Sequence, residues 1–368
     1  MYNINWATRP RKSSGSATFA IMIRNMKTEV AGDRVTLAEI AEETGSSLST
    51  ISKVLNGRAD VSKATRERIE HALHERGYVR RGAGRSESRP ELLELVFHGL
   101  DSIWSMELIG GVEAVAKEHG LSVVLTVSGD RHAPDPDWID GVIRRRPVGV
   151  VLVFSEISPE YRERLRARGI SFVIVDPAGD PSPDVPSVGS ANWSGGLAAT
   201  RHLIELGHRR IATITGPEDM MCSLARLDGF RSAMNSAGLP VDPAWVRFGT
   251  FEIAGGRDRA RELLALPTDL RPTAIFAGSD MQALGTLDAA REAGLAVPHD
   301  LSIVGYDDIS LAPWVSPPLT TVHQPLRRMG EEAARLAIRL SDEQPETTPR
   351  MDLATNLVVR ESTAPPAE

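Results

Sequence analysis

Seven continuously apolar runs, separated by segments with a helical pattern, constrain the chain most strongly from Leu92 onward. A strand that is apolar at successive positions is buried on both faces, which is typical of a parallel sheet covered by helices. The runs fall into two series, so the α/β sequence predicts two doubly wound parallel-sheet lobes. The runs are LLELVF from Leu92, LSVVLTV from Leu121, VGVVLVF from Val148 and ISFVIV from Ile170, then IATIT from Ile211, TAIFA from Thr273 and LSIVG from Leu301.

Two facing lobes of this kind predict a ligand site in the cleft between them. Doubly wound sheets bind ligands at the carboxyl ends of their strands. An enzyme of this architecture should carry a phosphate loop, a nucleophile elbow or a metal cluster, yet the sequence contains no GxGxxG, GxxxxGK[ST], GxSxG or HExxH motif, and its nine histidines are scattered. We therefore expect no enzymatic activity, no catalytic residue, no metal and no cofactor.

Upstream of the lobes, the pattern predicts three short amphipathic helices. The first begins with a capping box, Thr36 with Glu39, and ends at Gly45, because glycine adopts the left-handed conformation without a clash. The second follows Ser47 and the third follows Ser62. Such helices form either a small all-α helix-turn-helix domain or a protein-interaction bundle. Short polar residues at the start of the second helix favour DNA recognition in the major groove. The inward residues are Leu37, Ile40, Ala41, Ile51, Val54, Leu55, Ile69 and Leu73.

An ordered set of motifs runs through these helices: Val35-Thr36-Leu37, Ile40-Ala41, Gly45-Ser46, Thr50-Ile51-Ser52-Lys53-Val54-Leu55-Asn56-Gly57, Val61-Ser62, Thr65-Arg66-Glu67-Arg68-Ile69 and Gly77-Tyr78. This set resembles the DNA-binding domain of the LacI/GalR family of repressors. The resemblance implies that Leu48, Ser49 and Lys53 read bases. Leu48 and Ser49 depart from the bulkier polar pairs common in the family, so the operator sequence does not follow from other members. The implied phosphate anchors are Thr36, Ser47, Thr50, Ser52 and Asn56.

Further motifs in the lobes resemble the effector domain of the same family, which is similar to periplasmic sugar-binding proteins. They are Leu206-Gly207-His208-Arg209-Arg210-Ile211-Ala212, Ala225-Arg226, Gly229-Phe230, Ser279-Asp280, Ala283-Leu284-Gly285, Val304-Gly305-Tyr306-Asp307-Asp308 and Pro318-Leu319-Thr320-Thr321. The resemblance implies a dimer, and chain crossings between the lobes near Ala191, near Val322 and near the end. The expected parts are a disordered extension (1–33), the helix-turn-helix domain (34–79), a linker (80–90), an N-terminal lobe (91–190 and 322–360) and a C-terminal lobe (191–321).

The same resemblance implies a set of effector-binding residues. Arg226 would grip ligand hydroxyls or carboxylates, and Asp307 and Asp176 would accept from hydroxyls on opposite lobes. Asp280 is either a ligand contact or a helix cap, and each aromatic residue taken alone could belong to the core. Two aromatic faces, two carboxylates and an arginine together are typical of a sugar site. The full set is Ser102, Trp104, Asp176, Arg226, Phe251, Ser279 and Asp307.

The linker departs from the family, whose members usually carry a hinge helix that inserts a leucine into the minor groove. Gly82 and Gly84 disfavour a helix by about 1 kcal/mol each, and no leucine lies between Tyr78 and Leu92. The basic residues of the linker could contact successive DNA phosphates or insert into a narrow minor groove. Alternatively, the linker could be a flexible basic tether. The basic residues are Arg80, Arg81, Arg85 and Arg89.

Charge and cysteine content bear on partners and compartment. Residues 1–90 hold 16 Lys and Arg against 10 Asp and Glu, whereas the remainder holds 26 against 39. A basic N-terminal part followed by an acidic remainder favours a polyanionic partner for the N-terminal part. An ordinary basic surface would give the same charge distribution. Cys222 is the single cysteine, which fits a reducing cytoplasm. The apolar run from Phe19 to Ile23 is too short for a signal peptide or a membrane span.

Together these features predict a sequence-specific DNA-binding transcriptional regulator, a repressor that binds double-stranded operator DNA as a homodimer. A small-molecule effector, a sugar, would control it from the cleft. Two alternatives remain open. One is a sugar-binding transport receptor, which the missing signal peptide and the DNA-binding head disfavour. The other is a regulator that responds to a purine or an amino acid.

Overall fold

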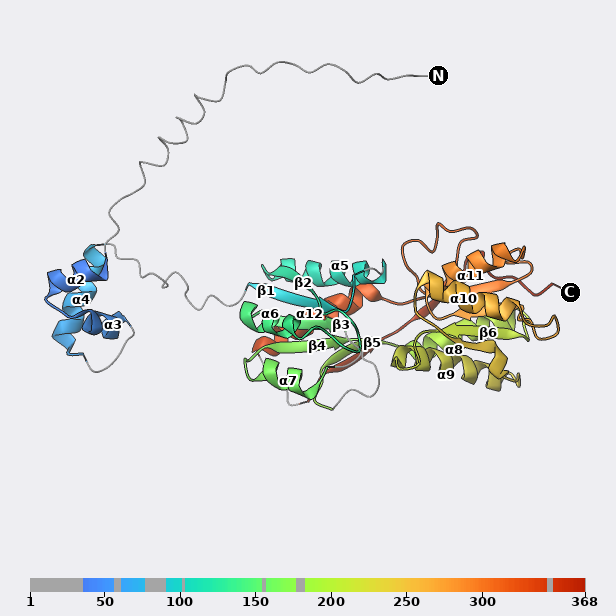
Figure 1. The fold of residues 1–368 in the computed structure, drawn as a ribbon, viewed down its shortest axis with the longest axis horizontal. Helices are drawn as coiled ribbons and strands as arrows, with labels where there is room; N and C mark the ends of the chain where they lie inside the picture. Colours follow the sequence, from blue (N-terminus) through green and yellow to red (C-terminus); the bar gives the residue numbers. More distant parts are fainter. Residues whose placement is uncertain are drawn as a thin grey trace, which may run out of the picture. The chain divides into compact units, whose positions relative to one another are not determined.

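The structure, a computed structural model, describes residues 36–55, 61–76, 91–100, 103–153, 157–176, 183–342 and 347–367. The chain divides into two compact units, one up to Ser88 and one from Arg89 onward, and each is described by itself (Figure 1). Within the described ranges, no helix has the length and apolar character that a membrane crossing requires. The expected fold class, a small helical domain followed by two parallel-sheet lobes, is confirmed.

The first unit is a three-helix bundle of α2 (Leu37–Thr44), α3 (Leu48–Leu55) and α4 (Lys63–Glu75). The predicted capping box is present, because the Thr36 hydroxyl accepts from the Glu39 backbone N–H while the Glu39 carboxylate accepts from the Thr36 N–H. Gly45 ends α2 in the left-handed region with φ 60°. An ion pair of 2.9 Å between Arg76 Nε and Glu43 Oε2 ties the end of α4 to α2. The buried core of the bundle is Ile40, Ile51, Val54, Ile69 and Ala72.

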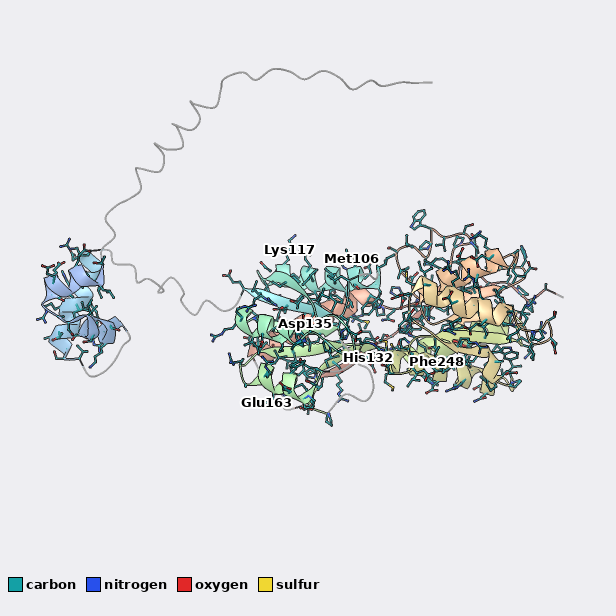
Figure 2. All side chains as sticks on the ribbon, in the orientation of Figure 1. Met106, Lys117, His132, Asp135, Glu163 and Phe248 are labelled. Carbon is teal, nitrogen blue, oxygen red and sulfur yellow. The ribbon has the colours of Figure 1, made fainter. Side chains whose placement is uncertain are left out.

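The first lobe of the second unit is a six-stranded parallel sheet in the order β11-β5-β4-β3-β1-β2. Helices α5 (Ile103–Glu118) and α12 (Leu326–Asp342) pack on one face, and α6 (Asp137–Arg145) and α7 (Pro159–Arg166) pack on the other. Met106 and Lys117 lie on the outer side of α5 (Figure 2). The strands are β1 (Leu92–Phe97), β2 (Ser122–Val127), β3 (Gly149–Val153), β4 (Ser171–Val175), β5 (Ser187–Ser190) and β11 (Arg350–Leu353).

Burial on both faces holds for β1, β3 and β4 but not for β2. Leu125 and Val127 on β2 are exposed, so the expectation of two-sided burial is wrong for this run. The reason is position, because β2 is the edge strand of its sheet and pairs with β1 alone among the described strands.

The second lobe is also a six-stranded sheet covered by helices on both faces, with the strand order β12-β10-β9-β8-β6-β7. Helices α10 (Ile253–Leu264) and α11 (Asp280–Glu292) pack on one face of the sheet, and α8 (Asn192–Glu205) and α9 (Met221–Ser236) pack on the other. A short 3-10 turn, η1 (Pro243–Trp245), precedes β7. The strands are β6 (Ile211–Thr215), β7 (Val246–Phe248), β8 (Ala274–Ala277), β9 (Ser302–Asp307), β10 (Thr320–His323) and β12 (Asn356–Val358).

The chain passes between the lobes after β5, after β10 and between β11 and β12. The crossing segments are bonded to each other: the Ala191 N–H donates to the Leu353 carbonyl at 2.8 Å, and the Thr355 hydroxyl donates to the Ala191 carbonyl at 3.2 Å. We expected residues up to 360 in the first lobe, but β12 lies in the second sheet, because Thr321 and Val358 pair in an antiparallel ladder. The lobes are thus joined by a three-segment hinge.

Close packing of α5 against α12 generates a stability prediction with a control one residue away. A Cβ added at Gly111 would lie 2.0 Å from the Arg327 carbonyl oxygen, which is backbone and cannot move aside, whereas one at Gly110 would meet the end of the flexible Arg327 side chain. We expect Gly111→Ala to lower the free energy of unfolding by about 1–3 kcal/mol. Gly110→Ala should be neutral or slightly stabilising, since alanine favours helices. Urea denaturation of both variants measures the difference, and equal stabilities would contradict the packing argument.

Candidate nucleic-acid interface and ligand cleft

The start of α3 carries a preformed group of hydroxyls. Ser47 Oγ accepts from the Thr50 backbone N–H at 3.2 Å, as expected for a residue that caps the helix. The same oxygen lies 2.7 Å from Ser49 Oγ and 2.9 Å from Thr50 Oγ1. Ser47 and Ser49 are exposed. Hydroxyls at the N-terminus of a helix suit phosphate oxygens, because backbone N–H groups and the helix dipole attract anions there.

One face of α3 is buried and the opposite face is open. Ile51 and Val54 point into the bundle, whereas Leu48 is 55% exposed, and Ser52 and Lys53 are also exposed. An apolar side chain exposed at the start of a helix is of the kind that can contact a thymine methyl group in the major groove. The outer face of α3 therefore offers apolar, hydroxyl and cationic groups side by side.

The other predicted DNA contacts divide into two groups. Thr36 is exposed at the start of α2, where its hydroxyl closes the capping box. Asn56, Arg80 and Arg81 lie outside the described residues, and so do the expected linker 80–90 and the expected extension 1–33.

In the second unit, a cavity of about 180 Å³ lies at the carboxyl ends of the first lobe's strands and is lined from the second lobe by Met220. Two predicted effector residues line it, Trp104 at the start of α5 and Asp176 after β4. Ser102 lies outside the described residues. The lining residues that the sequence did not predict include His98 and Arg131, which follow β1 and β2. The full lining is Phe97, His98, Gly99, Trp104, Ser105, Arg131, Val153, Val175, Asp176 and Met220.

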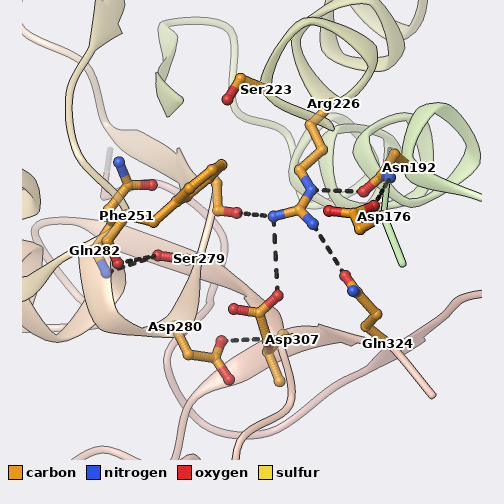
Figure 3. Close-up of polar contacts among 12 residues, drawn as sticks. Asp176, Asn192, Ser223, Arg226, Phe251, Ser279, Asp280, Gln282, Asp307 and Gln324 are labelled. Carbon is orange, nitrogen blue, oxygen red and sulfur yellow. Dashed lines mark hydrogen bonds and ion pairs between the residues drawn. The ribbon is translucent and has the colours of Figure 1, made fainter. Parts of the chain in front are cut away.

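Beside this cavity, the guanidinium of Arg226 on α9 is the centre of a buried polar cluster (Figure 3). Its Nε donates to Asn192 Oδ1 at 2.8 Å, and its Nη2 donates to Gln324 Oε1 at 3.0 Å. Its Nη1 donates to the Gly278 carbonyl. Asn192 in turn donates to Asp176 Oδ1 at 3.2 Å, which links the cluster to the first lobe. Arg226 therefore bonds to two of the segments that cross between the lobes.

Asp307 lies against Arg226 at the end of β9. Its Oδ1 is 3.8 Å from Arg226 Nη1, and its carboxylate accepts from the Asp280 backbone N–H. Burial raises the pKa of Asp307, although the neighbouring Arg226 opposes that rise. Asp307 has φ 110°, a conformation that side chains rarely adopt. Strained backbone of this kind is concentrated at binding sites.

Aromatic rings cover the guanidinium. The Arg226 Cζ atom lies 3.8 Å from the Tyr306 ring centroid and 5.4 Å from that of Phe251. The structure thus brings Asp176, Arg226, Phe251 and Asp307 to one place. Sequence reasoning missed Asn192, Gln324 and Tyr306, which complete the cluster.

Two neighbouring residues have roles in the fold. The Ser279 hydroxyl caps α11, since it accepts from the Gln282 N–H and donates to the Phe251 carbonyl, both at 3.1 Å. Asp280 is fully buried and accepts from the Thr321 hydroxyl at 2.5 Å and from the Ile309 N–H at 2.9 Å. Ser279 rather than Asp280 therefore caps α11, which excludes the helix cap among the two alternatives that the sequence left open for Asp280. Among the described residues, no group of three His, Cys, Asp or Glu side chains is arranged to hold a metal ion.

Comparison with known proteins gives consistent matches in both units. Residues 36–81 match the family described as bacterial regulatory proteins, lacI family, and residues 200–363 match a periplasmic binding protein-like domain. The chain is 37% identical to the HTH-type transcriptional regulator CelR of Thermobifida fusca over 89% of this chain and 98% of CelR. It is 35% identical to the ribose operon repressor of Escherichia coli K12 over 89% of this chain and 99% of the repressor.

Solved structures agree. The transcriptional regulator CelR–cellobiose complex superposes with a TM-score of 0.68 and 35% identity, covering 89% of this chain and 100% of that chain. The lac repressor dimer bound to operator and the anti-inducer ONPF superposes with a TM-score of 0.66 and 26% identity, covering 90% of this chain and 100% of the other.

The buried carboxyl group of Asp280 predicts a pH dependence of stability. Burial raises its pKa to about 7. Since an unfolded aspartate titrates near pH 4, the folded state binds the proton more tightly. The stabilisation that this proton provides is complete below about pH 4 and is lost as the pH rises through about 7.

Asp280→Asn should remove this loss, because a side-chain amide can donate to Thr321 Oγ1 and accept from the Ile309 N–H. We expect the wild-type chain to lose more unfolding free energy than the variant between pH 5 and pH 8, as measured by urea denaturation at each pH. Parallel pH profiles for the two proteins would show that Asp280 titrates normally.

Proposed function

The chain belongs to the lacI family of bacterial regulatory proteins, and we propose that it is a repressor whose DNA binding is controlled by a neutral sugar held between the two lobes of its second unit. The observation that carries the proposal is the cavity of about 180 Å³ at the carboxyl ends of the first lobe's strands, where the Trp104 ring and the Asp176 carboxylate line one space. An aromatic face suits the C–H surface of a sugar, and a carboxylate suits its hydroxyls.

The proposed DNA contacts follow from α3. A helix-turn-helix places its second helix in the major groove, and its first residues contact base edges. The exposed Leu48 and Ser49 hold those positions, and Lys53 follows one turn later. Thr36, Ser47, Thr50 and Ser52 are proposed phosphate contacts, which position the helix without reading sequence.

The cluster around Arg226 supports an effector with several hydroxyls. Its carboxylates, Asp176 and Asp307, come from opposite lobes, and Arg226 lies between them. A ligand that bonds to both lobes at once favours the closed cleft, and only such a difference in affinity can shift a conformational equilibrium. The cellobiose of the CelR complex and the ribose bound to a LacI family transcriptional regulator from Enterococcus faecium are ligands of this class. A purine or amino acid effector remains the second candidate, favoured by the stacking surface of Trp104.

We further propose a homodimer that acts in the cytoplasm, where chromosomal DNA is located, and that regulates rather than catalyses. The similar lac repressor binds its operator as a dimer. Apolar side chains are exposed on both lobes, among them Met106 and Leu125 on the first and Trp314, which is 84% exposed, on the second. Such side chains are enriched at the centres of protein interfaces. A transport receptor is disfavoured, because residues 36–81 match the family's DNA-binding domain.

Loss of a cation from α3 tests the DNA proposal. We expect Lys53→Ala to weaken operator binding by about tenfold and to reduce the salt slope of log K by about 1, because one fewer counterion is released. Lys117→Ala on α5 is the matched control, since it removes an exposed lysine from the other unit and should leave both quantities unchanged. Fluorescence anisotropy with a genomic operator fragment at several salt concentrations measures them. An unaltered slope for Lys53→Ala would exclude it from the contacts.

Trp104 reports on the sugar proposal. Addition of cellobiose, ribose or a related neutral sugar should change the tryptophan emission of the full chain, because the ligand would displace water from the Trp104 ring. Trp104→Phe should lose most of that change, whereas Trp314→Phe, at an exposed position outside the cavity lining, should retain it. If no sugar of the panel changes the tryptophan emission and a purine or an amino acid does change it, the second candidate is favoured.

A further inference from the structure

We propose that Arg131 and Asp219 form an ion-pair latch at the mouth of the cleft, which holds the two lobes closed and slows the release of the effector. Arg131 follows β2 in the first lobe, and Asp219 lies between β6 and α9 in the second. Arg131 Nη2 is 2.8 Å from Asp219 Oδ1, and His132 Nε2 lies 3.5 Å from the other carboxylate oxygen. His132 is seen where the two lobes meet (Figure 2).

The loop that presents Arg131 is held in shape by its own hydrogen bonds. Asp130 Oδ1 accepts from the backbone N–H groups of His132 at 2.8 Å and Ala133 at 3.0 Å, and these bonds lower the pKa of Asp130. The Ser128 carbonyl accepts from the Asp135 N–H at 2.7 Å. Little loop entropy is therefore lost when the guanidinium meets the other lobe.

The segment that presents Asp219 is equally confined. The Met220 N–H donates to the Pro217 carbonyl at 3.2 Å, which forms a turn with Asp219 near its end. Gly216 begins this segment, and a Cβ there would lie 2.1 Å from the Phe251 ring, so the backbone passes directly beneath a residue that the sequence predicts to contact the effector. The Arg131 hydrogen bond lowers the pKa of Asp219, which keeps the carboxylate charged at neutral pH.

Its position makes this pair more consequential than an ordinary surface ion pair. Isolated surface pairs stabilise a fold very little, and here the two side chains are 23% and 52% exposed. This pair, however, joins two bodies that hinge on each other, so its free energy acts directly on the ratio of closed to open cleft. The bonds from Arg226 to Asn192 and Gln324 lie at the crossing segments. The latch joins the lobes through loops outside those segments.

Arg131 also lines the cavity, so the latch and the pocket share a side chain. Burial lowers the pKa of His98 beside it, and the charge of Arg131 lowers it further, so the imidazole is neutral at pH 7. A neutral imidazole and a guanidinium already paired with Asp219 suit an uncharged ligand. The identity of that ligand rests on the proposed function, but the latch does not.

Distances between the lobes test the latch without any ligand. In the full chain, nitroxides on Lys117→Cys in the first lobe and Asn235→Cys in the second report the opening by pulsed electron resonance, with labelled chains diluted in unlabelled chains. Cys222 is buried, and burial raises its thiol pKa, so it resists labelling.

We expect Arg131→Ala and Asp219→Ala each to shift the distance distribution toward a more open state, and 1 M salt to do the same to the wild type. The single charge reversals Arg131→Asp and Asp219→Arg should open the cleft further, and the double reversal should restore it. Arg231→Ala is the control, because its ion pair with Asp228 lies within α9, in one lobe, and its loss should change nothing. Unaltered distributions in both alanine variants would overturn the latch.

Ligand release gives the second readout, with cellobiose as the probe. Asp219→Ala is the cleaner variant, since Asp219 does not line the cavity. We expect it to increase the dissociation rate of cellobiose about threefold or more while the association rate changes less. An unchanged dissociation rate would overturn the role of the latch in retention. If cellobiose and the sugar panel do not bind at all, the sugar proposal fails, and the distance measurements still decide on the latch.

Discussion

The buried charge of Arg226 is the constraint on which the second unit depends. A guanidinium removed from water is costly unless hydrogen bonds and a counter-charge surround it. Its partners come from separate parts of the chain: Asn192 from the first crossing, Gln324 from the second, and Asp307 from the end of β9. Because Asn192 and Gln324 satisfy the same charge, one side chain holds two of the three crossing segments against α9.

This arrangement would couple the proposed effector site to the hinge. Asp176 reaches Arg226 through Asn192, so a ligand hydroxyl that bonds to Asp176 competes within a network that also holds a crossing segment. The carboxylate of Asp307 lies 3.8 Å from Arg226 in the same network, and burial raises its pKa. The residues that would recognise the effector are therefore also residues that set the angle between the lobes. Such coupling needs no separate pathway.

Sequence reasoning succeeded where a pattern is local. Buried strands such as β3 and β6 are continuous apolar runs, and Arg226 and Asp307 stand in motifs long enough to be identified. It failed where tertiary position decides the outcome. The three residues of β12 form a strand because β10 lies beside them. The capping of α11 by the Ser279 hydroxyl was not predicted either, because that role depends on where the helix begins.

Arg131 and Gln324 had no distinguishing sequence signal, because loops and crossing segments have no periodicity. The rule that ligands bind at the carboxyl ends of strands does cover Arg131.

The helical unit has its own core around Ile40 and Ile51, and the ion pair of Arg76 with Glu43 ties two of its helices together. Because this core lies within the first unit, we expect an effector bound in the second unit to leave the structure of α3 unchanged. Under the proposed function, the effector would act on where the reading helices of a dimer are held, since two half-sites are read together only at one separation. The hinge, the proposed latch and the pocket would then affect DNA binding through that separation.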